Sequence, residues 1–306
     1  MKGFYPEGWC PDSTENIKRS YSITRLQEAM QGGEILEGMA YMCDSDHNLL
    51  VNLGSMKGVI PRIEGAIGIA EGYTRDIALI SRVGKSVCFT VEEISTDISG
   101  NKYALLSRRR AQEICKENFL DTLYPGDIVN ARVTHLESFG AFCDIGCGNI
   151  ALLPIDSISV SRIAHPSDRF SSGDDIKVII KSVDSAGRIT LSHKELLGTW
   201  QENADTFLQG QTVSGIVRSV ESYGIFVELA PNLAGLAESK EGIRVGQTAS
   251  VYIKSIIPEK MKIKLIIIDS FDMSEKLPTS YFWEGEHIDE FTYSPPSSAK
   301  VIKTIF

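Results

Sequence analysis

A repeated stretch in the second half of the chain constrains the fold more than any other feature of the sequence. In both copies a glycine is followed 13 residues later by an aromatic-Gly-x-Phe core, and strand-like segments then follow in the same order. The first copy begins at Gly126 and has the core Phe139-Gly140-Ala141-Phe142. The second begins at Gly210 and has the core Tyr223-Gly224-Ile225-Phe226. Such self-similarity indicates that one structural unit is used more than once.

A weaker copy precedes these two and begins at Gly33. Its segment Gly58-Val59-Ile60-Pro61 corresponds to Ala151-Leu152-Leu153-Pro154 of the next copy. In this alignment His47 takes the place of Phe139, and Leu50 takes the place of Phe142. The first copy therefore keeps neither aromatic residue of the core.

Each copy is a run of short alternating strands with glycine-marked turns. Val129, Ala131 and Val133 alternate with polar residues such as Arg132, so one face of this strand is expected to point inward. Five short strands in a unit of this size are typical of a small closed barrel of the OB type. The predicted fold class is all-β with helical linkers, in three tandem five-stranded OB-fold barrels.

Between the copies the apolar spacing changes from two to about 3.6, which indicates amphipathic helices. Another short helix is expected over residues 22–31, with Thr24 as its N-cap. The predicted organisation is an N-terminal extension (1–32), a first, degenerate repeat (33–107), a helical linker (108–123), a second repeat (124–192), a second helical linker (193–208), a third repeat (209–269) and a C-terminal segment (270–306). This last segment matches no repeat, and the sequence leaves open whether it is an ordered β-rich cap or a loose tail.

Several classes of protein are disfavoured by what the sequence lacks. No stretch approaches the roughly 18 apolar residues of a membrane span, and the start has no signal-peptide core, so a cytoplasmic protein is expected. The six cysteines include no CxxC pair, which argues against a metal site, and Cys143 is expected to be a buried reduced thiol. Glycine-rich phosphate loops are absent, and the histidines are isolated, so we expect no cofactor and no enzymatic activity.

Three motifs in register now point to a family. The core Phe139-Gly140-Ala141-Phe142, the segment Ala151-Leu152-Leu153-Pro154 and the segment Arg188-Ile189-Thr190-Leu191-Ser192-His193-Lys194 together resemble the S1 RNA-binding domain. This domain is the repeat of the largest small-subunit ribosomal protein of bacteria. The resemblance covers roughly residues 33–269. It implies an OB fold, single-stranded RNA as the ligand, no cofactor and no catalysis.

In this family the RNA-binding face uses two aromatic residues, a histidine, an aspartate and an arginine. The resemblance therefore implies an RNA-binding set in the second repeat of Phe139, Phe142, Asp184 and Arg188. The set implied for the third repeat is Tyr223, Phe226 and Lys262. The histidine position holds Pro154 in the second repeat and Glu238 in the third, and the aspartate position of the third falls near Ile257. Degenerate leading repeats in the family serve protein docking.

The residue types fit this chemistry because any base can stack on an exposed ring, for roughly 1–3 kcal/mol per base. Phe139 and Phe142 are three residues apart, and in a regular strand they would point to opposite faces. Both rings share one face only if the chain turns or bulges at Gly140. The alternative is that the rings belong to the core. We expect Phe142 and Phe226 to be exposed on the face that carries Arg188 and Lys262.

The charge of the chain is the strongest argument against nucleic-acid binding. The net charge is −9, and residues 34–107 carry ten acidic and six basic side chains, whereas residues 209–269 carry six acidic and seven basic ones. RNA binding should thus depend on stacking more than on phosphate neutralisation. The expected function is binding of single-stranded RNA, such as mRNA, by a monomer in translation or at the small ribosomal subunit. A protein-interaction scaffold, or a regulatory RNA-binding factor that is not ribosome-bound, stays open.

Overall fold

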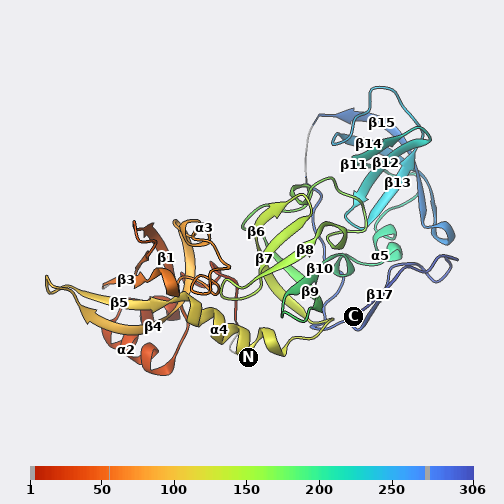
Figure 1. The fold of residues 1–306 in the computed structure, drawn as a ribbon. Coiled ribbons are helices and arrows are strands. Elements are labelled where there is room, and N and C mark those ends of the chain that lie inside the picture. Colours follow the sequence, from red (N-terminus) through yellow and green to blue (C-terminus); the bar gives the residue numbers. More distant parts are fainter. Residues whose placement is uncertain (1–3, 55, 273–275) are drawn as a thin grey trace. The chain divides into compact units, whose positions relative to one another are not determined.

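Three closed five-stranded barrels make up most of the chain, as the sequence predicted (Figure 1). The computed structural model describes residues 4–54, 56–272 and 276–306. In all three barrels the strands follow the same cyclic order, in which the first strand pairs with the second and fourth, and the third pairs with the second and fifth. The third and fifth strands run parallel, whereas the fourth strand runs antiparallel to both the first and the fifth. This is the order of an OB-type barrel.

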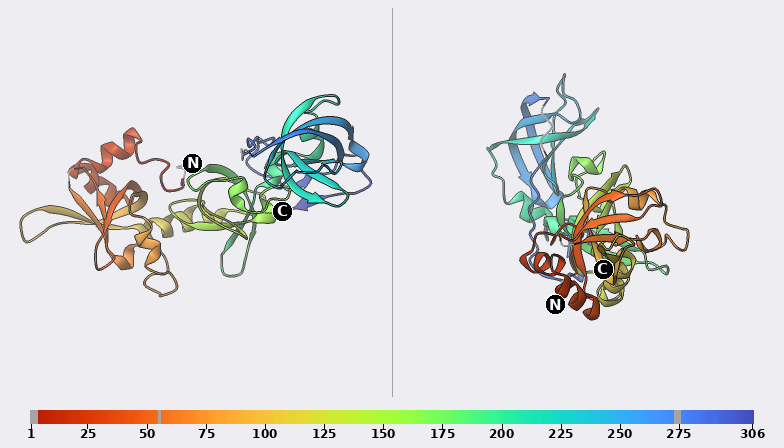
Figure 2. Two further views of the ribbon diagram at one scale, coloured as in Figure 1. Left: turned by 90° about the horizontal axis from the view of Figure 1, so that it is seen from above. Right: turned by 90° about the vertical axis from the view of Figure 1, so that its left-hand side faces the viewer.

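The strands are short, as their glycine-marked turns require. The first barrel contains β1 (Leu36–Cys43), β2 (Leu49–Asn52), β3 (Lys57–Ile60), β4 (Lys85–Thr96) and β5 (Lys102–Ser107). The second contains β6 (Ile128–Glu137), β7 (Gly140–Asp144), β8 (Ile150–Pro154), β9 (Asp175–Val183) and β10 (Ile189–Ser192). The third contains β11 (Thr212–Glu221), β12 (Gly224–Ala230), β13 (Leu233–Ala237), β14 (Thr248–Ile257) and β15 (Lys262–Phe271), and its strands curl around a closed interior (Figure 2).

Helices flank and join the barrels. The α-helices are α1 (Thr14–Ser20), α2 (Ile23–Gly32), α3 (Ile77–Ile80), α4 (Arg108–Asn118) and α5 (Trp200–Ala204). The 3-10 turns are η1 (Arg62–Glu64), η2 (Leu120–Thr122), η3 (Ile155–Ser157), η4 (Pro166–Asp168), η5 (Lys194–Leu197) and η6 (Pro258–Lys260). Two further strands, β16 (Glu290–Thr292) and β17 (Lys303–Ile305), form a separate two-stranded sheet.

Alternation along the strands places the core inside each barrel. Val129, Ala131 and Val133 are buried on β6, whereas Arg132 between them is only partly covered, as the pattern predicted. On β15 the buried residues Ile263, Leu265 and Ile267 alternate in the same way with exposed neighbours. Burial of such apolar side chains is the main favourable contribution to folding. It leaves the other face of each strand available for function.

The chain divides into two compact units, which are described separately. The first comprises residues 1–123 together with 144–150, and the second comprises residues 124–143 and 151–306. The loop 144–150, which connects β7 to β8, therefore belongs with the first unit.

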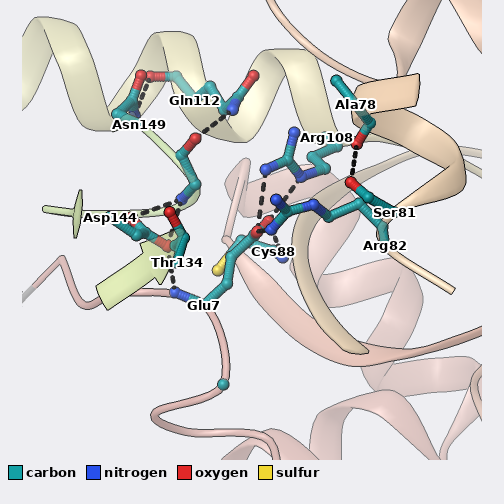
Figure 3. A network of polar contacts seen from close by, with 12 residues as sticks. Glu7, Ala78, Ser81, Arg82, Cys88, Arg108, Gln112, Thr134, Asp144 and Asn149 are labelled. Atoms are coloured by element: carbon teal, nitrogen blue, oxygen red, sulfur yellow. Dashed lines mark hydrogen bonds and ion pairs between the residues drawn. The ribbon is translucent and has the colours of Figure 1, made fainter. Parts of the chain in front are cut away.

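A buried ion pair organises the first unit (Figure 3). The Arg108 guanidinium at the start of α4 donates to both carboxylate oxygens of Glu7, at 2.6 and 2.9 Å. The backbone N–H of Cys88 on β4 donates to the same carboxylate, at 3.1 Å. The Glu7 N–H in turn donates to Asp144, at 2.8 Å. The N-terminal extension is thus an integral part of this unit, because buried charges are tolerated only when paired.

Both segments predicted as helical linkers contain helical turns, but only the first contains a long α-helix. Residues 108–118 form α4, capped by the Ser107 hydroxyl, and η2 continues the turn. Residues 193–208 do not form one helix, since η5 and α5 are separated at Gly198. Gly198 has a φ of +84°, which ends the first turn, and Thr199 then caps α5.

The helix predicted over residues 22–31 is α2, which begins at Ile23. Ser22, and not Thr24, occupies the N-cap position of α2, so the prediction of Thr24 was wrong. Ser22 is a residue type preferred at N-caps, although its side chain makes no capping bond here. The predicted end is confirmed, because Gly33 adopts the left-handed conformation at the C-cap.

The C-terminal segment is an ordered cap of the second unit. Ile288, Phe291 and Tyr293 are buried in the same apolar cluster as the interior of the third barrel and Trp200 of the linker. A bridge between Asp127 and His287 attaches the segment to the second barrel as well. Of the two possibilities that the sequence left open, the structure shows the ordered cap.

Asn232, in the turn between β12 and β13, joins four segments of this unit. Its side chain accepts from the N–H of Val160 at 3.0 Å and donates to the carbonyls of Lys194 and Gly198, at 2.7 and 2.8 Å. Its own carbonyl accepts from the Tyr293 hydroxyl at 2.5 Å. Asn232 is fully buried. The second barrel, the linker, the third barrel and the cap therefore share one hydrogen-bond network.

Candidate nucleic-acid interface

Two aromatic rings adjoin on the outside of the second barrel. Phe139 lies in the tight turn between β6 and β7 and is 53% exposed, and Phe142 is half-buried on β7. Their ring centroids are 6.0 Å apart and the rings are perpendicular, at 90°. An edge-to-face pair of this kind is a favourable aromatic contact. It leaves the Phe139 ring largely open to solvent, as a stacking surface requires.

The backbone geometry explains how two rings three residues apart come together. Ser138 and Phe139 form the turn itself, and β7 begins at Gly140. A Cβ atom on Gly140 would lie 2.5 Å from the carbonyl oxygen of Leu153, which is too close. Glycine is therefore required because a neighbouring strand passes directly over this position. The expected turn is confirmed, and it immediately precedes Gly140.

The third barrel repeats this arrangement. Tyr223 lies in the turn between β11 and β12 and is 68% exposed, and Phe226 is half-buried on β12. The ring centroids are 6.2 Å apart at an interplanar angle of 85°. Gly224 has a φ of +151°, and a Cβ there would lie 2.5 Å from the Ala237 carbonyl. The same local sequence thus gives the same ring pair twice.

A third ring, that of His135, lies beside the ring pair of the second barrel, and the sequence interpretation missed it. Its ring stacks on Phe142, with centroids 6.4 Å apart and an interplanar angle of 24°. Its Nε2 atom lies 2.7 Å from a carboxylate oxygen of Glu137. In the third barrel Ser219 is the cross-strand partner of Phe226, so the third ring is missing there. Antiparallel pairing of the two strands was the signal that could have located His135.

The predicted cations lie two strands from the rings, because β8 separates β7 from β10 and β13 separates β12 from β15. Leu152 on β8 pairs with Thr190, and the corresponding Leu236 on β13 pairs with Lys264. Arg188 lies two residues before Thr190, and Lys262 lies two residues before Lys264, so the two cations occupy equivalent positions. In the third barrel Phe226 pairs with Leu236. Because paired residues point to the same face, Phe226 and Lys262 share the outer face, as predicted.

Asp184 stabilises the turn that leads to Arg188. Its Oδ1 atom accepts from the N–H groups of Ala186 and Arg188, both at 2.9 Å, and its Oδ2 accepts from Arg188 Nε at 2.7 Å. The backbone and side-chain bonds from Arg188 lower the pKa of Asp184. The Arg188 side chain is still 83% exposed. Asp184 therefore shapes the turn and orients a guanidinium that remains open to solvent.

The first barrel lacks these features. Leu50 pairs with Val59, which places it at the position of Phe226, and Leu50 is only 4% exposed. His47, at the position of Phe139, has a φ of +63° and lies about 4.0 Å from Asp76. No ring pair is formed by these two positions. The prediction that the first repeat has no aromatic platform here is confirmed.

In residues 4–54, 56–272 and 276–306, no group of three or more His, Cys, Asp or Glu side chains is arranged to hold a metal ion. Within those same ranges no helix has the length and apolar character needed to cross a membrane.

Comparison with known proteins finds similarity to a family in the region of the second barrel. Residues 123–194 match the S1 RNA binding domain. The chain is 29% identical over 302 residues to the small ribosomal subunit protein bS1 of Staphylococcus aureus strain COL, a match that covers 92% of this chain and 74% of that protein. The bS1 protein of Staphylococcus epidermidis is 29% identical over 272 residues, or 83% of this chain and 66% of that one.

The comparison with solved structures finds a multidomain protein with nucleic acid binding domains from Streptococcus pneumoniae. It is 17% identical, with a TM-score of 0.25, and the match covers 78% of this chain and 75% of that chain.

Proposed function

We infer that this chain, which carries an S1 RNA-binding domain and is homologous to the ribosomal protein bS1 along most of its length, binds single-stranded RNA in connection with translation at the small ribosomal subunit. The protein acts as a binding protein and not as an enzyme. The observation that carries this inference is a pair of adjoining rings, one exposed and one half-buried, found at equivalent places in two barrels.

Each ring pair offers a stacking surface with a cation nearby. The edge-to-face contact holds Phe142 and Phe226 in place, and the more exposed Phe139 and Tyr223 extend the surface into the turn. A base that stacks on such a ring gains roughly 1–3 kcal/mol, whatever its identity. Arg188, just before β10, or Lys262, at the start of β15, lies two strands from the rings and would then meet the phosphate. The mode of binding is thus tolerant of sequence.

The acidic charge of the chain sets the salt dependence. The net charge is −9, and residues 34–107 hold ten acidic side chains against six basic ones. Few phosphates would be neutralised, so the affinity should fall only gently as salt rises. The first barrel, which is acidic and has the buried Leu50 at the ring position, takes little part in RNA binding and contacts protein instead.

A binding titration of the full-length protein with an unstructured RNA of about 10 to 30 nucleotides tests this proposal, at two salt concentrations. Removing one ring pair (Phe139→Ala with Phe142→Ala) should cost about 2–4 kcal/mol, or about 30-fold to 1000-fold in affinity. The pair Tyr223→Ala with Phe226→Ala should cost a similar amount, for the same reason.

Tyr41→Ala is the matched control, because Tyr41 is a 48% exposed ring on β1 of the first barrel. Its removal should leave the RNA affinity unchanged. Folding of each variant is checked by circular dichroism. Unchanged affinity after loss of both ring pairs would reject RNA binding by this face and would favour a protein-interaction scaffold.

A further inference from the structure

Three cysteines from distant parts of the sequence meet in the first unit. Cys88 lies on β4, Cys115 lies in the last turns of α4, and Cys147 lies in the loop 144–150. Cys88 and Cys147 line the same cleft, and the Cys115 sulfur lies against Gly146, the residue before Cys147. All three are at least 95% buried, and all are free thiols. This cluster could not be predicted from the sequence, because no two of these cysteines are close along the chain.

The cluster is tightly packed around the loop. A Cβ atom added to Gly146 would lie 2.8 Å from the Cys115 Sγ atom, so this sulfur lies directly against the loop backbone. The side chain of Gln112, one turn earlier on α4, donates to the carbonyl of Gly148 at 2.8 Å. Cys147 itself has a φ of +49°, which is uncommon for a residue other than glycine. The fold thus holds Cys147 in place between two other sulfurs.

A cleft gives small molecules access to this cluster. The cleft has a volume of about 550 Å³ and lies within the first unit. Cys10, Cys88 and Cys147 are among its lining residues, and Glu37 lies beside them. A small oxidant such as a peroxide is far smaller than this volume. Cys147 is therefore covered against large molecules but open to small ones.

The surroundings of Cys147 favour its thiolate. Hydrogen bonds from Cys115 and Cys88 lower the pKa of Cys147, although burial and the Glu7 carboxylate oppose this effect and Arg108 adds to it. The same contacts with Cys147 raise the pKa of Cys88 and of Cys115. A thiolate flanked by thiols is the arrangement of a nucleophilic cysteine with a resolving partner. Cys88 is labelled beside Glu7 and Arg108 in Figure 3.

We propose that Cys147 is a peroxide-reactive thiol that forms a disulfide bond with Cys115. The Cys147 thiolate attacks one oxygen of hydrogen peroxide, the O–O bond breaks, and hydroxide leaves, which gives a sulfenic acid on Cys147. The Cys115 sulfur then attacks the Cys147 sulfur, and the thiol proton leaves with the hydroxyl group as water. The two cysteines are oxidised by two electrons in total, and the peroxide is reduced. The product joins α4 covalently to the loop 144–150.

The test uses the full-length protein, treated with hydrogen peroxide under native conditions and then blocked with a maleimide. Digestion without reductant, followed by mass spectrometry, should yield a crosslinked peptide that contains Cys115 and Cys147. The number of thiols that react after denaturation should fall from six to four, and dithiothreitol should restore all six. Cys43, which is more exposed, should stay reduced for longer than Cys147.

Two variants separate the roles. Cys115→Ser should stop the reaction at the sulfenic acid, which dimedone would trap on Cys147. Cys43→Ser is the control and should react as the unaltered protein does. Oxidation of Cys43 before Cys147 would overturn the proposal, as would a lack of any disulfide. A bond between Cys88 and Cys147 would overturn the assignment of Cys115 as the partner.

Discussion

Glu228 of β12 is the side chain whose removal should most weaken the second unit. It is fully buried and accepts hydrogen bonds from Arg218 Nε, at 2.6 Å, and from the buried guanidinium of Arg169. Arg169 follows η4 of the second barrel, so the pair joins the second and third barrels. Burial lowers the pKa of Arg169, although the Glu228 carboxylate opposes this effect. The two cations therefore depend on a single buried carboxylate.

The change Glu228→Gln keeps the shape of the side chain and removes its charge. Arg218 has a second partner in Asp168, at 3.4 Å, but two of the nitrogens of Arg169 and one of Arg218 already have no hydrogen-bond partner among the described residues. Breaking a buried ion pair in this way typically costs 3–5 kcal/mol, because it leaves an uncompensated charge. We expect a loss of about 3–5 kcal/mol in the free energy of unfolding of the second unit.

Urea unfolding followed by tryptophan fluorescence measures this loss. Trp200 is a suitable probe, because it is 2% exposed and packs in the apolar core of the third barrel. With a slope of about 2–3 kcal/mol per molar urea, the midpoint should fall by about 1–2.5 M. The matched control is Glu221→Gln, an exposed glutamate on β11, which should change the stability by less than about 0.5 kcal/mol.

Two outcomes test whether Glu228 neutralises the two arginines. If Glu228→Gln loses less than about 1 kcal/mol, the carboxylate does not neutralise the two arginines as described. Conversely, replacing both Arg169 and Glu228 by methionine should recover part of the stability, since an apolar pair of similar volume carries no desolvation cost.

Three further predictions concern the same unit. Burial lowers the pKa of His193 from 6.5 to about 4, so as the pH falls the unfolded chain takes up a proton before the folded chain does. The free energy of unfolding should therefore decrease by up to about 3 kcal/mol between about pH 6.5 and pH 4. Urea unfolding across this range should show the decrease, and His193→Gln should make the stability less dependent on pH. Gly140→Ala should lower both the thermal midpoint and the RNA affinity, because the new Cβ would meet the Leu153 carbonyl at 2.5 Å and shift Phe139, whereas Ser138→Ala in the same turn should do neither. Asn232→Ala should cost at least about 3 kcal/mol in urea unfolding, because it leaves three buried backbone groups without their partner, and a loss below about 1 kcal/mol would show that water replaces them.

The three barrels and both ring pairs could be predicted from the sequence because they depend on local and repeated patterns. Alternating apolar residues determine which face of a strand is buried, whatever the rest of the chain does. The glycine after Phe139 or Tyr223 marks a turn in which neighbouring residues already decide where the ring points. The spacing of Arg188 and Lys262 from the rings is likewise fixed by the strand order of the barrel.

Contacts between distant segments were decided only by the tertiary structure. Asp144 and Glu228 occupy the same position of the repeat, yet Asp144 accepts from the N–H of Glu7, whereas Glu228 binds two arginines. His135 beside Phe142 and the sulfur contacts of Cys147 also join residues with no shared spacing. A repeat pattern specifies how a barrel folds. A side chain on the outside of a barrel, however, binds whichever surface covers it, and that surface comes from a distant part of the sequence.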